Sequence, residues 1–193
     1  MASPGTLNVV VTGNPPFMEY DYNTSQLVRD ALPDSITGSN QKNIRIFKYF
    51  RDTLDTYDDV RYVSRDIWSG KRSLFLPKPE PNDKEEHVNV DFILHLGMIA
   101  LRWDPNQFRF ETSARRDGYS LPGDDGKFVD SDQLKHLDLP KTLSTSLDVK
   151  TAWLKVKQCY PHLPQAHDSK AIELARDIIV AYISGLADDP IFN

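Results

Sequence analysis

The chain has 193 residues, 39% of them apolar and 26% charged, so it can bury one substantial hydrophobic core but is too short to suggest two. Its net charge of −5 at pH 7 argues against nucleic-acid and membrane partners, because phosphate backbones and anionic lipid surfaces repel an acidic protein. The start is not signal-like, no apolar run approaches the roughly 20 residues of a membrane span, and the single cysteine excludes an intramolecular disulfide. We therefore expect one cytoplasmic domain over residues 1–193, with no cofactor.

The first predicted elements form a strand, a loop and a helix. Residues 7–11 are an almost continuous apolar run that predicts a buried strand. The run ends at Thr12-Gly13-Asn14-Pro15-Pro16, which no regular element continues, so these residues predict a loop of functional interest. Apolar residues at helical spacing then predict a helix over residues 23–32. Its N-cap is expected to be one of Asn23, Thr24 and Ser25.

The middle of the chain contains two further predicted strands. Residues 44–50 alternate apolar and basic side chains, which predicts a strand exposed on one face. Residues 51–75 fit neither the helical nor the strand period and are left unassigned. Three prolines and dense charge predict a surface loop over residues 76–87. Residues 88–98 are the most strand-like segment, and we expect them to form the central strand.

The last third combines a polar stretch with two predicted helices. Residues 108–111 alternate over a short span and favour a hairpin-like excursion after the central strand. Apolar faces then predict helices over residues 149–156 and 171–182, the second capped by Asp168 or Ser169. This alternation of strands and helices predicts a three-layer α/β/α fold with a mostly parallel sheet. Such sheets bind ligands at the carboxyl ends of their strands, here at residues 13–17 and 97–102.

Several segments resemble pyroglutamyl peptidase type I, a family with the phosphorylase-hydrolase-like fold. Residues 9–17 followed by Asn23-Thr24-Ser25 resemble its signature of an apolar strand, T-G-F-G-P-F and N-x-S. Residues 92–98 look like its second conserved strand, and residues 171–183 are similar to its closing helix. Glu111 precedes Tyr119 much as the catalytic glutamate of the family precedes a G-Y pair. The resemblance implies a cysteine peptidase that removes an N-terminal pyroglutamate with a Cys, His and Glu arrangement.

The sequence departs from that family where the nucleophile should lie. Family members carry their cysteine in a D-A-G-R-Y-L-C-N motif, and no segment here resembles it. The chain passes directly from Gln158 to Cys159-Tyr160-Pro161-His162, as if a strand and a helix were deleted. Because hydrolysis needs an ionised thiol with a base in reach, this departure argues against ordinary peptidase activity. Strand edges left exposed by such a deletion favour a homodimer.

Six residues are the candidates for a site. The resemblance implies catalytic roles for Glu111, His162 and Cys159, where His162-Leu163-Pro164 resembles the His-Val-Pro of the catalytic histidine. The alternatives are a surface carboxylate paired with a nearby arginine for Glu111, a loop imidazole for His162 and a small apolar residue at a helix end for Cys159. The substrate-binding candidates are Asn14, Phe17 and Met98.

Two details of these candidates bear on the ligand. Asn14 and Pro15 replace the Phe-Gly of the family, so the pocket should prefer something other than pyroglutamate. His95, inside an apolar strand, is interpreted as a core histidine with a hydrogen-bond partner. We predict no metal site.

Three functions remain open from the sequence. The first is a pyroglutamyl-peptidase-like protein that has lost peptidase activity and retains a pocket for a small molecule or a peptide N-terminus. The second is an enzyme of changed chemistry, such as a cyclase, isomerase or hydrolase, in which Glu111 transfers a proton on a small carbonyl or lactam compound. The third is an active peptidase that uses Cys159 and His162.

Overall fold

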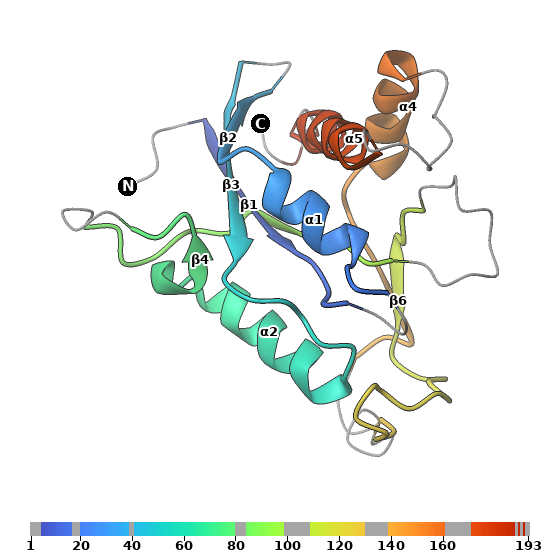
Figure 1. The fold of residues 1–193 in the computed structure, drawn as a ribbon. Helices are drawn as coiled ribbons and strands as arrows, with labels where there is room; N and C mark the ends of the chain where they lie inside the picture. The colour runs from blue at the N-terminus through green and yellow to red at the C-terminus, as the bar shows by residue number, and fades with distance from the viewer. Residues whose placement is uncertain are drawn as a thin grey trace.

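The computed structural model in Figure 1 contains a central sheet with helices on both sides. It describes residues 5–16, 20–38, 41–79, 84–98, 109–129, 139–160, 171–187, 189 and 191. The strands are β1 (Thr6–Thr12), β2 (Ser35–Thr37), β3 (Asn43–Tyr49), β4 (Phe75–Leu76), β5 (Phe92–His95), β6 (Ser113–Arg115) and β7 (Thr142–Ser144). The helices are α1 (Thr24–Ala31), α2 (Tyr57–Ser69), α4 (Val149–Cys159) and α5 (Ala171–Leu186), with one 3₁₀ turn over Arg72–Leu74.

Strand β1 lies in the middle of the main sheet. It pairs in parallel with β3 on one side and with β5 on the other. Two short strands, β2 and β4, pair antiparallel with opposite ends of β3. The predicted mostly parallel sheet is thus confirmed. The central position belongs to β1, however, and the prediction that residues 88–98 form the central strand is wrong.

Two hydrophobic cores cover the two faces of this sheet. Leu7, Val9 and Val11 of β1 enter the core beneath α1 and α5, whereas Val10 enters the core beneath α2. Successive side chains of a strand point to opposite faces, so a nearly continuous apolar run, broken here only by Asn8, is typical of a strand covered on both sides. The same alternation sends residues of β3 into both cores. The prediction that this strand is exposed on one face is therefore wrong.

Helices α1 and α5 pack against each other on one face, and α4 packs on α5. The predicted cap of α1 is confirmed, because Asn23 accepts a hydrogen bond from the Ser25 N–H. The second predicted cap, Asp168 or Ser169, lies outside the described residues. No helix among the described residues is long and apolar enough to span a membrane.

Helix α2 covers the opposite face and was not predicted. Thr56 caps its start by accepting from the Asp59 N–H at 3.2 Å. Its end is fixed by Gly70, which has a φ of 66° and lies so close to Val88 that a Cβ would stand 2.4 Å from the Val88 carbonyl oxygen. Only glycine allows both the positive φ and this close approach to Val88. Helix α2 therefore ends just before Gly70.

The hairpin-like excursion is present but displaced along the chain. Its first strand is β6, which begins at Ser113 and pairs antiparallel with β7 as a separate two-stranded sheet (Figure 1). Phe110 attaches this excursion to the helical layer, because its ring stacks on Tyr182 at 4.2 Å between centroids and lies 5.1 Å from Trp153.

We predict that Gly13→Ala destabilises the protein by about 1–3 kcal/mol, because a Cβ at Gly13 would lie 2.9 Å from the Ser25 carbonyl oxygen and 3.1 Å from the Gln26 Cα. These neighbouring atoms belong to the backbone of α1, so they cannot move away as a flexible side chain could. Urea denaturation measures the change. Gly97→Ala is the control, expected within about 0.5 kcal/mol of the parent, since its Cβ would meet nothing nearer than 3.9 Å. Equal effects of the two substitutions would contradict this packing.

Phe110→Ala should lower the free energy of unfolding by about 2 kcal/mol, less than for a fully buried ring, because Phe110 is only partly buried between two aromatic side chains. Phe128→Ala is the matched control, since that ring is 63% exposed and should be replaceable at little cost. Denaturation curves of the two variants that coincide would show that Phe110 does not anchor the excursion.

Candidate functional site

The carboxyl ends of β1 and β5 are held side by side. The backbone N–H of Leu96 donates to the Thr12 carbonyl at 3.1 Å, and Thr12 Oγ1 lies 2.9 Å from the ring Nδ1 of His95. His95 remains exposed, although protein atoms around its ring replace enough water to lower the pKa of this histidine. His95 was interpreted as a core histidine, which is right about its partner and wrong about its burial.

The loop after β1 is locked onto the start of α1. The Asn14 N–H donates to Ser25 Oγ at 3.0 Å, and the Ser25 hydroxyl donates in turn to Asn23 Oδ1 at 2.7 Å. The side-chain amide of Asn23 donates to the Pro15 carbonyl at 2.9 Å, so the network returns to the loop. This network explains why an N-x-S sequence follows the T-G-N-P-P loop, because both polar side chains hold the loop as well as the helix start.

The chain after β3 reaches the same loop from the α2 side. The Thr53 N–H donates to the Gly13 carbonyl at 2.9 Å, and the Asn14 side-chain amide donates to Asp55 Oδ1. On its other side, Asn14 Oδ1 lies 3.9 Å from the point where a Cβ on Gly97 would stand. Asn14 thus lies where the segments following three parallel strands converge. We call Thr12, Asn14, Asp55, His95 and Gly97 the carboxyl-end cluster.

Asp55 is the carboxylate of this cluster. Loss of water around its carboxyl group raises the pKa of Asp55, and the negative charge of Asp124 adds to the rise. The hydrogen bond from Asn14 opposes it by favouring the ionised form. A carboxyl group with a raised pKa beside an amide side chain can accept hydrogen bonds from a ligand and can also exchange a proton.

A turn from the polar part of the chain packs beside the cluster. The Asp124 N–H donates to the Asp55 carbonyl at 2.9 Å, and the Tyr57 hydroxyl donates to the Leu121 carbonyl at 2.7 Å. The rings of Tyr57 and Tyr119 meet edge to face, with 5.9 Å between centroids. Residues 119–124 therefore pack against the chain at Asp55 and Tyr57, next to the cluster.

The structure describes four of the six predicted site residues, and these do not all lie together. Asn14 belongs to the cluster, and the half-buried Met98 follows Gly97. Phe17 and His162 lie outside the described residues. Glu111 is exposed just before β6, and no described contact joins it to Asn14 or Met98. Cys159 is a free, exposed thiol in the last turn of α4.

Sequence reasoning missed Asp55 and the role of Thr12. Asp55 lies just before α2, a helix that the spacing of apolar residues did not predict. The sequence therefore did not indicate that Asp55 lies at the carboxyl edge of the sheet. The strand end at Thr12 was predicted, and pairing it with His95 needed only the register of two parallel strands. Among the described residues, no group of three or more His, Cys, Asp and Glu side chains could hold a metal ion.

Comparisons with known proteins place this arrangement in a known fold. No family model and no curated protein matches the chain. Two solved structures of pyroglutamyl peptidase I from Bacillus amyloliquefaciens share 18% and 17% identity with it, cover 79% and 80% of it, and have a TM-score of 0.49. The chain spans 61% of the length of these Bacillus chains.

A third structure extends the likeness along the whole chain. It is a mutant pyrrolidone carboxyl peptidase from the hyperthermophile Pyrococcus furiosus, with 14% identity, coverage of 93% of this chain and 98% of that one, and a TM-score of 0.55. At this identity the likeness concerns the fold. The predicted three-layer α/β/α architecture is confirmed, and the chain has the pyroglutamyl peptidase fold.

Proposed function

We propose that this protein binds a small molecule or a peptide N-terminus at the carboxyl-end cluster and does not hydrolyse pyroglutamyl peptides. The observation that carries the proposal is that no described contact joins the thiol to the cluster. Cys159 lies at the exposed end of α4, and no hydrogen bond joins it to a described carboxylate or imidazole. Asn14 and Asp55 instead occupy the end of the sheet at which parallel α/β proteins bind ligands.

The surroundings of Cys159 support a thiol without a catalytic role. Cys159 lies in the last turn of α4, at the negative end of the helix dipole, and the Tyr160 N–H that follows donates to the Val156 carbonyl at 2.9 Å. Nucleophilic cysteines need the opposite environment, with a helix N-terminus or a cationic partner that stabilises the thiolate.

The carboxyl-end cluster offers acceptors to a ligand. Asn14 uses its side-chain N–H to bind Asp55, which leaves Asn14 Oδ1 directed toward Gly97. The second carboxylate oxygen of Asp55 accepts no hydrogen bond from the described residues. An amide or ammonium group of a ligand would satisfy both acceptors, and the end of a peptide provides such a donor. The replacement of Phe-Gly by Asn-Pro in the loop favours this polar ligand over a lactam ring.

We expect the purified protein to leave a fluorogenic pyroglutamyl amide intact, because no described contact brings the Cys159 thiol to the carboxyl-end cluster. Release of the fluorophore above the buffer rate is the measurement, with circular dichroism to establish that the sample is folded. Turnover would contradict the proposal. Its loss in Cys159→Ser would then assign the activity to that thiol and restore the peptidase interpretation.

Asp55→Asn should weaken binding of L-alanyl-L-alanine, a dipeptide with a free N-terminus, by tenfold or more in isothermal titration calorimetry. The variant removes the negative charge that pairs with the ligand ammonium group. Asp58→Asn is the matched control on the first turn of α2, because the Asp58 side chain is 73% exposed and should leave the affinity unchanged. Equal binding by both variants would contradict a role for Asp55.

The same binding should depend on pH with a defined sign. Only ionised Asp55 attracts the ammonium group, so affinity is full at neutral pH and falls as acid protonates the carboxyl group. Since loss of water raises the pKa of Asp55 above that of an ordinary aspartate, the loss of affinity should begin at a higher pH than an ordinary aspartate would show. An affinity that stays constant down to pH 4 would contradict this assignment.

A further inference from the structure

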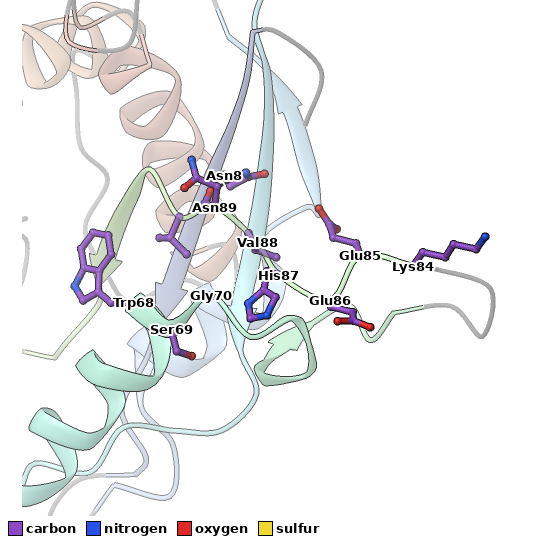
Figure 2. A pocket seen from close by; sticks show the side chains of 11 residues that line it. Asn8, Trp68, Ser69, Gly70, Lys84, Glu85, Glu86, His87, Val88 and Asn89 are labelled. Carbon is purple, nitrogen blue, oxygen red and sulfur yellow. Dashed lines mark hydrogen bonds between the residues drawn. The ribbon is translucent and has the colours of Figure 1, made fainter. Parts of the chain in front are cut away.

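A cavity of about 760 Å³ lies at the opposite end of the sheet from the carboxyl-end cluster. Figure 2 shows its wall, which combines the end of α2 with the segment that leads to β5. Asn8 of β1 contributes to it, and Asn8 and Thr12 lie about 13 Å apart along the strand at 3.3 Å per residue. The volume falls in the range of ligand pockets in proteins. We call it the Trp68 cavity after the aromatic residue at its edge.

The wall of the Trp68 cavity is held by backbone contacts. The Val88 N–H donates to the Gly70 carbonyl at 2.7 Å, and the Arg72 N–H donates to the Glu86 carbonyl at 2.9 Å. Glu85 pairs with Arg45 through two hydrogen bonds of 2.8 and 2.6 Å. A site needs a fixed wall to bind with little loss of entropy, and these contacts provide it.

Asn8 supplies an unusual group to this wall. Asn8 is 2% exposed, and its side-chain N–H donates to the Asn89 carbonyl at 2.8 Å. This bond fixes the orientation of the amide, because the reversed amide would place two oxygens against each other. The Asn8 Oδ1 then has no hydrogen-bond donor. A buried acceptor without a donor is costly, and an N–H group from a ligand would relieve that cost.

Trp68 and Asn89 provide recognition groups at the rim. The indole of Trp68 is 61% exposed, although large aromatic side chains are normally covered. The Asn89 side chain is exposed and makes no hydrogen bond with the described residues. An aromatic face suits a planar ring, and an amide side chain can both donate to and accept from the edge of a nitrogen heterocycle.

The charges around the Trp68 cavity favour a neutral ligand. Glu85 is neutralised by Arg45 at 2.6 Å and Arg72 at 3.7 Å. The remaining charged side chains of the wall are Lys84 and Glu86, which are exposed and opposite in sign. A ligand with a strong charge of either sign would meet one attractive and one repulsive group, so neither anions nor cations gain from the site.

We propose that the Trp68 cavity binds an uncharged planar heterocycle that carries N–H donors, such as a purine nucleoside. The ring stacks on Trp68, an exocyclic or ring N–H reaches Asn8, and Asn89 contacts the edge of the base. This site lies outside the carboxyl-end cluster and does not depend on the function proposed for it.

The test is isothermal titration calorimetry of the full chain with adenosine. We expect saturable binding that Trp68→Ala weakens by at least tenfold, since the stacking surface is lost. Tyr62→Ala is the matched control, because Tyr62 is an aromatic residue of the same helix, is 56% exposed and does not line the cavity. Asp55→Asn should also leave adenosine binding unchanged, which separates this site from the carboxyl-end cluster.

Two outcomes would overturn the proposal. One is the absence of adenosine binding to the folded wild-type chain at millimolar concentration. The other is binding with the same affinity in wild type and Trp68→Ala. Ribose serves as the ligand control, because it lacks the planar ring and should bind more weakly than adenosine.

Discussion

The parallel pairing of β1 with β3 and β5 is the constraint on which the rest of the structure depends. It requires side chains that tolerate burial on both faces, and the Leu7–Val11 run provides them. It also places the strand ends together, so that the loop after Thr12 meets the segments after β3 and β5. Gly13 then allows that loop to approach the backbone of α1. The carboxyl-end cluster is a consequence of this pairing.

Helix α2 links the two ends of the sheet. Its start adjoins Asp55 in the carboxyl-end cluster, and its last turn carries Trp68 and Gly70 at the edge of the Trp68 cavity. Asn8 and Thr12 each lie two residues from Val10, so both point to the same face as Val10, the face that α2 covers. One strand and one helix therefore position the polar groups of both proposed sites.

The sequence predicted the elements whose pattern follows burial and failed where it does not. In β1, α1 and α5 the large apolar residues whose burial is described are buried or half-buried, and these elements were predicted. α2 buries Val63 and Ile67 but also exposes Val60, Tyr62 and Trp68, so its period is blurred. Val88 and Val90 are apolar because they pack in the core beneath α2, and not because they belong to a strand. Asn14 could be predicted from the strand end, whereas Asp55 could not, since its place depends on α2.

We propose that the ligand binds at Asn14 and Asp55 and not at Cys159. The most direct test maps amide chemical shifts by nuclear magnetic resonance while L-alanyl-L-alanine is added to the protein. If the dipeptide binds there, the largest changes in chemical shift should occur at residues of the carboxyl-end cluster, namely Asn14, Asp55, His95 and Gly97. Shifts concentrated around Cys159 and the end of α4, with none at Asn14, would contradict it.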